Sequence, residues 1–135
     1  GVGCKPQERL TLQETQRILA GDTAWMITSQ RPLLTALYVD MKTHRLAPKT
    51  VVAYKRMPFV YGPGHVRVTI DWAIRTGAPR DFLDPQGLTL PIDEDVTLLE
   101  VKWDEFLPGI IRKAAALKSR APTAFSKYAA CRVYR

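Results

Sequence analysis

Three segments of the chain alternate apolar and polar residues with the period of two that is typical of half-buried strands. They span residues 50–57, 66–72 and 98–103. The sequence Gly-Pro-Gly at 62–64 indicates a turn, so we expect the first two strands to form an antiparallel hairpin. We also expect Pro58 to end the regular pairing of the first strand, because proline has no backbone N–H to donate.

Apolar residues spaced three and four apart predict helices at 12–19, within 29–46 and at 106–117. Thr11 and Glu14 have the spacing of a capping box, and Gly21 is placed to end the first helix. Pro32 falls in the first turn of the second helix, and Pro108 is placed to start the third. We expect the third helix to pack on the apolar face of the sheet, which is formed by Val68, Ile70, Leu99 and Val101.

The opposite face of each predicted strand carries polar and charged residues. They are Tyr54 and Arg56 on the first strand, Arg67 and Thr69 on the second, and Glu100 and Lys102 on the third. In an ordinary antiparallel sheet such a face is exposed to solvent and needs no function. Charged side chains on all three strands also suit a barrel whose polar side chains point inward.

Composition and charge narrow the classes of partner. The chain has 135 residues, which indicates one domain, and 46% of them are hydrophobic, which is enough for a packed core. The net charge of +7 lies entirely in residues 112–135, where seven residues are basic and none is acidic. Such a segment favours an anionic partner, although Arg112, Lys113 and Lys118 also suit a solvated helix face.

Several classes of protein do not fit the sequence. No apolar run approaches the roughly 20 residues of a membrane span, and no secretory signal pattern is present. Cys4 and Cys131 do not make a disulfide framework, so we expect a reducing, cytoplasmic location. His44 and His65 lie too far apart to indicate a Cys/His metal cage. Nucleic acid is an unlikely partner, because no nucleic-acid-binding motif and little aromatic interleaving occur.

The polar face has the side chains that bind phosphates. Arginine and lysine pointing into a barrel can bind phosphate oxygens, arginine through a bidentate fork. A glutamate among them can hold Mg²⁺ or Mn²⁺ against the phosphates. We expect this ligand to be Glu100 and not the acidic run at 93–95, because neighbouring side chains do not converge on an ordinary strand.

Four short motifs resemble the ordered signatures of the VTC domain, the polyphosphate polymerase module named after the vacuolar transporter chaperone complex. They are AYKR at 53–56, VRVTID at 66–71, LEVK at 99–102 and AFSKY at 124–128. The resemblance covers roughly the whole chain. The Glu-x-Lys and Lys-x-Arg strands of the family's first half are missing, so the chain is expected to correspond to the C-terminal half of the module only.

The resemblance implies an α+β fold in which an antiparallel sheet forms part of a triphosphate-tunnel barrel of the CYTH-like type, with helices packed on its outer face. It implies transfer of the terminal phosphate of ATP to a polyphosphate chain with the help of a divalent metal. By this resemblance Glu100 would hold the metal. The residues implied in catalysis are Arg56, Arg67 and Lys127, and those implied in substrate binding are the same three with Tyr54, Lys102 and Ser126.

Two other functions stay open at this stage. A triphosphatase of the same fold would use water as the nucleophile, and a non-catalytic module would only bind polyphosphate or another polyanion. Half a tunnel cannot enclose a triphosphate, so the isolated chain could be inactive. An unpaired edge strand can pair with a strand of another chain. We therefore expect a homodimer or association with a missing N-terminal half.

Overall fold

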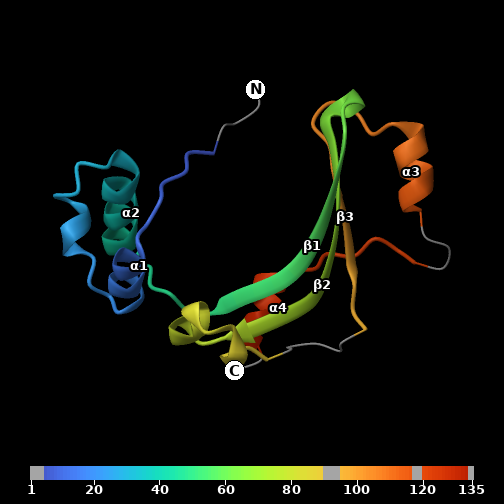
Figure 1. Cartoon of the computed structure of the whole chain (residues 1–135). Helices are drawn as coiled ribbons and strands as arrows, with labels where there is room; N and C mark the ends of the chain where they lie inside the picture. Colours follow the sequence, from blue (N-terminus) through green and yellow to red (C-terminus); the bar gives the residue numbers. More distant parts are fainter. Residues whose placement is uncertain (1–4, 90–94, 117–119, 134–135) are drawn as a thin grey trace. The chain divides into compact units, whose positions relative to one another are not determined.

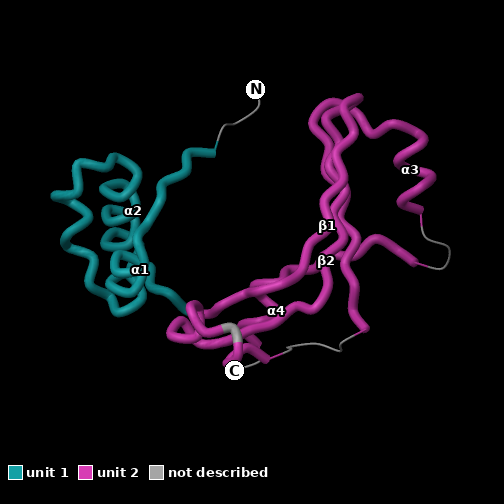
Figure 2. The backbone as a smooth tube through the Cα atoms, in the orientation of Figure 1, with its two compact units in different colours: residues 1–49 teal, residues 50–135 magenta. Residues whose placement is uncertain are grey.

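The computed structural model describes residues 5–89, 95–116 and 120–133. It divides the chain into two compact units, residues 1–49 and residues 50–135 (Figure 2). Within the described residues, no helix combines the length and the apolar character needed to cross a membrane.

The first unit is a small helical unit. Helix α1 (Leu12–Leu19) begins at the predicted capping box, in which the Thr11 hydroxyl accepts from the Glu14 backbone N–H at 3.1 Å and the Glu14 carboxylate accepts from the Thr11 N–H at 2.9 Å. Helix α2 (Pro32–Thr43) begins at its predicted proline. Met26 and Leu34 form the buried core of this unit.

The second unit is built on a three-stranded antiparallel sheet with strand order β1-β2-β3 (Figure 1). The strands are β1 (Val51–Tyr61), β2 (Val66–Gly77) and β3 (Leu98–Lys102). The three predicted strands and the hairpin between the first two are therefore confirmed. In the described residues the sheet is open, with β1 and β3 at its edges, and no barrel closure is seen.

Strand β1 continues past the point where the sequence predicts its end. Pro58 pairs with Thr69, and regular pairing runs on to Tyr61 opposite Val66. The prediction that Pro58 ends pairing was wrong because β1 is an edge strand, where proline is tolerated.

A β-bulge interrupts the hairpin between Ala53 and Lys55, where the register of β1 against β2 shifts. Ala73 of β2 lies at this position with a φ of 51°. Bulges bend a strand and increase its twist, and both strands curve in their middle (Figure 1). Beyond the bulge, Ile74 and Thr76 are buried, so the buried face of β2 continues along the strand.

The helices do not pack as the sequence predicts. Helix α3 (Gly109–Ala115) is shorter than the expected helix at 106–117, whose last residue lies outside the described residues, and it buries no side chain. Leu99, on the apolar face that α3 was expected to cover, is 39% exposed. The chain before α3 is held at the hairpin turn, where the Asp104 N–H donates to the Gly64 carbonyl at 3.2 Å, so α3 starts at this end of the sheet.

Helix α4 (Lys127–Val133) makes the helix–sheet contact instead, against β1 and β2. Its Cys131 is fully buried, and the Thr76 hydroxyl donates to the Cys131 carbonyl at 3.5 Å. Lys127, in the first turn of α4, reaches Asp71 on the polar face of the sheet. The contacting helix is therefore joined to the polar face and not to the apolar outer face.

Candidate functional site

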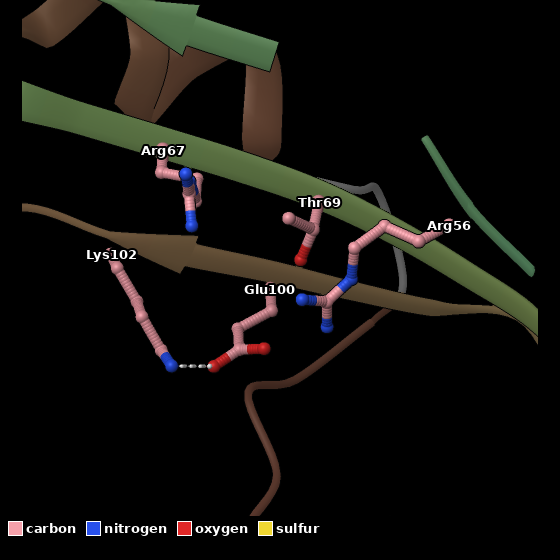
Figure 3. A pocket seen from close by; sticks show the side chains of 5 residues that line it. All are labelled: Arg56, Arg67, Thr69, Glu100 and Lys102. Carbon is pink, nitrogen blue, oxygen red and sulfur yellow. Dashed lines mark ion pairs between the residues drawn. The ribbon is translucent and has the colours of Figure 1, made fainter. Parts of the chain in front are cut away.

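The register of the three strands places the predicted polar residues on one face, in neighbouring rows. The facing pairs are Arg56 and Asp71, Thr69 and Glu100, and Arg67 and Lys102. Because side chains alternate between faces along each strand, all six project from the same side of the sheet. Five of them line one pocket, shown in Figure 3: Arg56, Arg67, Thr69, Glu100 and Lys102.

Burial on this polar face is uneven, because Arg56, Arg67 and Lys102 are exposed while two residues between them are buried. Thr69 is 4% exposed and Asp71 is 1% exposed. On the opposite, apolar face, Met57 and Phe59 are 49% and 50% exposed. The cations of the polar face are therefore accessible to a ligand, while Thr69 and Asp71 between them are buried.

Asp71 is the centre of the ionic contacts on this face. Its carboxylate accepts two hydrogen bonds from Arg56, from Nε and Nη2, each at 2.7 Å. Lys127 Nζ lies 2.8 Å from Asp71 Oδ2. The hydrogen bonds from Arg56, followed by those from Lys127, lower the pKa of Asp71 to about 2, and the same contact raises the pKa of Arg56.

Tyr54 completes this cluster from β1. The Arg56 guanidinium carbon and the Lys127 ammonium each lie 5.0 Å from the centre of the Tyr54 ring. Both distances suit a cation–π contact. The structure thus brings Tyr54, Arg56 and Lys127 together around Asp71, from β1, β2 and α4.

Glu100 and Lys102 form an ion pair along β3, with Lys102 Nζ 2.9 Å from Glu100 Oε1 (Figure 3). The hydrogen bond from Lys102 lowers the pKa of Glu100, and the nearby charges of Lys127 and Arg56 lower it further. Glu100 is therefore ionised at neutral pH. Arg67 differs from the other cations, since no acidic partner is recorded for it among the described residues.

Ser126 lies apart from the pocket in the structure. It directly precedes α4, and its hydroxyl accepts from the Ala129 backbone N–H at 3.2 Å. This contact stabilises the start of the helix and leaves the predicted role in substrate binding untested. Lys127, the neighbouring residue, does not line the pocket and is linked to the pocket residue Arg56 through their shared partner Asp71.

A divalent metal would find few protein ligands here. Within residues 5–89, 95–116 and 120–133, no group of three or more His, Cys, Asp or Glu residues is placed to hold a metal. Residues 93 and 94 of the acidic run lie outside the described part of the chain. Glu100 still fits a Mg²⁺ or Mn²⁺ ion of the kind that one carboxylate and several phosphate oxygens hold between them.

Asp71 is the residue of this site that sequence reasoning did not single out. The alternation in VRVTID places it on the polar face with Arg67 and Thr69, but a strand-end aspartate on that face looks like a solvated residue. The signal that could have found it is the pairing with β1, because the register sets Arg56 directly opposite.

The fold and the site define an α+β protein that presents a cluster of cationic and acidic side chains on one face of an antiparallel sheet. The family model of the VTC domain matches residues 5–134, and the chain belongs to this family. The match covers nearly the whole chain, so the expectation that the chain corresponds to the C-terminal half only is not borne out. No curated protein and no solved structure was found to match the chain.

Proposed function

We propose that this VTC-domain protein binds the triphosphate of ATP and a polyphosphate chain on the polar face of its sheet, and that it transfers the terminal phosphate of ATP to that chain. The observation that carries the proposal is the pocket in which Arg56, Arg67 and Lys102 surround Glu100. Membership of the VTC domain family supports a function that involves polyphosphate. A cytoplasmic location, where ATP is available, goes with this function.

The protein's part in such a transfer is positioning and charge neutralisation, because phosphoryl transfer leaves little covalent work to side chains. Arg67 has no recorded acidic partner in the described residues, so its fork is available to bind two oxygens of one phosphate. Arg56 supplies further positive charge in the same pocket, and Lys127 lies next to Arg56 at their shared partner Asp71. The Tyr54 ring makes cation–π contacts with Arg56 and Lys127. Ser126 stabilises the start of the helix that carries Lys127.

Glu100 is the residue that would hold a divalent ion, with phosphate oxygens as the other ligands. When bound, the ion would neutralise charge on the phosphates that react. Lys102, which pairs with Glu100 at 2.9 Å, would then be free to turn toward a phosphate oxygen. This exchange gives Lys102 a role in substrate binding that is secondary to that of the arginines.

The side chains of the pocket favour polymerisation over hydrolysis. General-base activation of water works best with a base whose pKa lies near neutral pH. Among the described residues that line the pocket, the only carboxylate is Glu100, and its pKa is lowered by Lys102. The terminal oxygen of a polyphosphate chain is already ionised and needs no base. A triphosphatase on the same face is therefore the less favoured alternative.

The open sheet favours the second alternative, a module that binds polyphosphate without turnover. The three strands found in the described residues form an open sheet, and enclosing a triphosphate requires more strands than these. A second copy of the chain or additional strands would supply them. Catalysis is then a property of the completed assembly, whereas phosphate binding belongs to the face described above.

The products formed from ATP distinguish these functions. We expect incubation with ATP and Mn²⁺ or Mg²⁺ to give the inner-phosphate signals of polyphosphate in ³¹P NMR spectra. Orthophosphate alone would identify a triphosphatase, and binding of tripolyphosphate without any product would identify a binding module. Failure to bind either ATP or tripolyphosphate would overturn the proposal.

Two variants test in the same assay whether Glu100 holds the divalent metal. Glu100→Gln is expected to abolish turnover that depends on Mn²⁺, because it replaces the only charged ligand that the pocket offers among the described residues. Glu105→Gln is a matched control, since it makes the same substitution at an exposed position of the same unit, outside the pocket. An unchanged metal dependence in Glu100→Gln would place the metal elsewhere.

A further inference from the structure

Asp71 combines burial and charge in a way that no other described acidic residue matches. It is 1% exposed, and each of its oxygens contacts a cation. Burying an ionised carboxylate is costly unless it is paired and hydrogen-bonded, and here the pairing comes from two different elements. Arg56 belongs to β1 and Lys127 to α4, so one carboxylate on β2 joins three elements.

The contact with Asp71 occupies part of the hydrogen-bonding capacity of Arg56. Asp71 takes Nε and Nη2 of the guanidinium, which is one complete edge of its planar fork. No partner is recorded for Nη1 within the described residues. Figure 3 shows the Arg56 side chain reaching from β1 toward Glu100. A ligand in the pocket therefore meets the remaining edge of a guanidinium whose orientation is already set.

Lys127 is oriented in the same way. Its ammonium has three donors, and the one directed at Asp71 Oδ2 holds it at 2.8 Å. The side chain is 19% exposed, and the Tyr54 ring lies 5.0 Å from the ammonium. Without Asp71, a lysine stem of four carbons would have many rotamers to sample.

We infer that Asp71 is a positioning residue for phosphate binding: it orients Arg56, with Lys127 held beside it, so that the free donors of Arg56 face a phosphate in the pocket. The inference rests on the proposed function. From electrostatics alone, a negative charge in a phosphate site should weaken anion binding. The positioning role predicts the opposite, that Asp71 strengthens phosphate binding. The two accounts predict opposite changes when the charge of Asp71 is removed.

The test is calorimetric titration of the full chain with tripolyphosphate. Asp71→Asn is compared with Asp104→Asn, which removes one negative charge at an exposed position of the same unit. The positioning role predicts that Asp71→Asn weakens binding about tenfold, whereas Asp104→Asn leaves it unchanged or slightly tighter. Equal or tighter binding by Asp71→Asn would overturn the inference.

A double-mutant cycle separates positioning from a general loss of structure. If Asp71 acts through Arg56, the cost of Asp71→Asn should shrink to less than about twofold when Arg56→Gln is already present. The same cost in both backgrounds would show that Asp71 does not act through Arg56. Should Asp71→Asn fail to fold, Arg56→Lys serves instead, because lysine keeps the charge but cannot bridge both oxygens. Unchanged affinity in Arg56→Lys would overturn the inference.

The outcome for the wild type separates this inference from the function on which it rests. If the wild-type chain does not bind tripolyphosphate, the proposed function itself is overturned. If the wild type binds and Asp71→Asn binds equally well, only the positioning role is lost.

Discussion

The two arginines of the polar face have different surroundings, and this difference decides their roles. Arg56 is held by a bidentate contact to Asp71, whereas no acidic partner is recorded for Arg67 among the described residues. An arginine with a free fork can bind a phosphate through two parallel hydrogen bonds. Arg67 is thus the stronger candidate for direct phosphate contact, and Arg56 is the better oriented of the two.

The ion pairs of Asp71 should make stability depend on acid pH. The pKa of Asp71 falls from 3.8 to about 2 on folding, so the unfolded chain binds the proton more tightly. The carboxylate therefore contributes its stability above pH 4, about 2 kcal/mol, and loses it as the pH falls toward 2. Thermal unfolding should show that Asp71→Asn is less stable than the wild type at pH 6 and that the difference shrinks by pH 2. A difference that stays constant over this range would contradict the ionised pairing.

At the residue scale, the sequence predicted which residues lie on the polar face of the sheet, but not which of them contact one another. Alternation along three strands placed Arg56, Arg67, Glu100 and Lys102 on one side, and the structure brings them to one pocket. The role of Asp71 could not be predicted in this way, because it depends on register and on burial by α4. Neither quantity follows from a period-two pattern within one strand.

At the scale of elements, the turn between β1 and β2 holds the segment that leads to α3. Gly64 has a φ of 77°, and an added Cβ would run into the Phe106 carbonyl oxygen. Gly62 has a φ of −57°, and a Cβ there would meet nothing within 4 Å. These two glycines of one turn therefore offer a matched comparison.

We expect Gly64→Ala to destabilise the second unit by about 1–3 kcal/mol, because a left-handed conformation and a close backbone approach both exclude a side chain. Gly62→Ala should change the free energy of unfolding by less than about 0.5 kcal/mol. Chemical denaturation of the two variants measures both values. Equal stability of the two would show that the turn does not require glycine at position 64.

The sequence predicted the strands and the first two helices well, but not what the helices cover. Period-two alternation and a capping box are local signals, and both gave elements close to those observed. Pro58 was misread because the edge position of β1 is a property of the sheet order. The contact of α4 with the sheet includes the Lys127–Asp71 pair and the buried Cys131, which join residues far apart in the sequence.

At the scale of the whole molecule, the open sheet leaves apolar side chains exposed among the described residues of the second unit. Met57, Phe59 and Leu99 lie on the outer face and are 39–50% exposed. Strand β1 is an edge, and its residues from Lys55 to Tyr61 are all exposed. An exposed edge with apolar side chains favours pairing with another chain.

We therefore expect the protein to self-associate at micromolar concentration, which sedimentation velocity can measure. Phe59→Lys should weaken the association, because it places a charge in the apolar outer face beside the edge. Lys55→Gln, on the same strand and face, should have little effect. A monomer that stays monomeric at these concentrations and still polymerises phosphate from ATP would contradict the need for a completed assembly.

The central claim is that phosphate chains bind to one particular face of the sheet. Tripolyphosphate titration of two charge-reversal variants tests it most directly. Arg67→Glu reverses a charge in the pocket, and Lys55→Glu makes the same change of charge at an exposed position on the opposite face. We predict that Arg67→Glu abolishes tripolyphosphate binding and that Lys55→Glu retains at least half of the wild-type affinity. Equal loss in both variants, or binding that survives Arg67→Glu, would contradict the assignment of the site to the polar face.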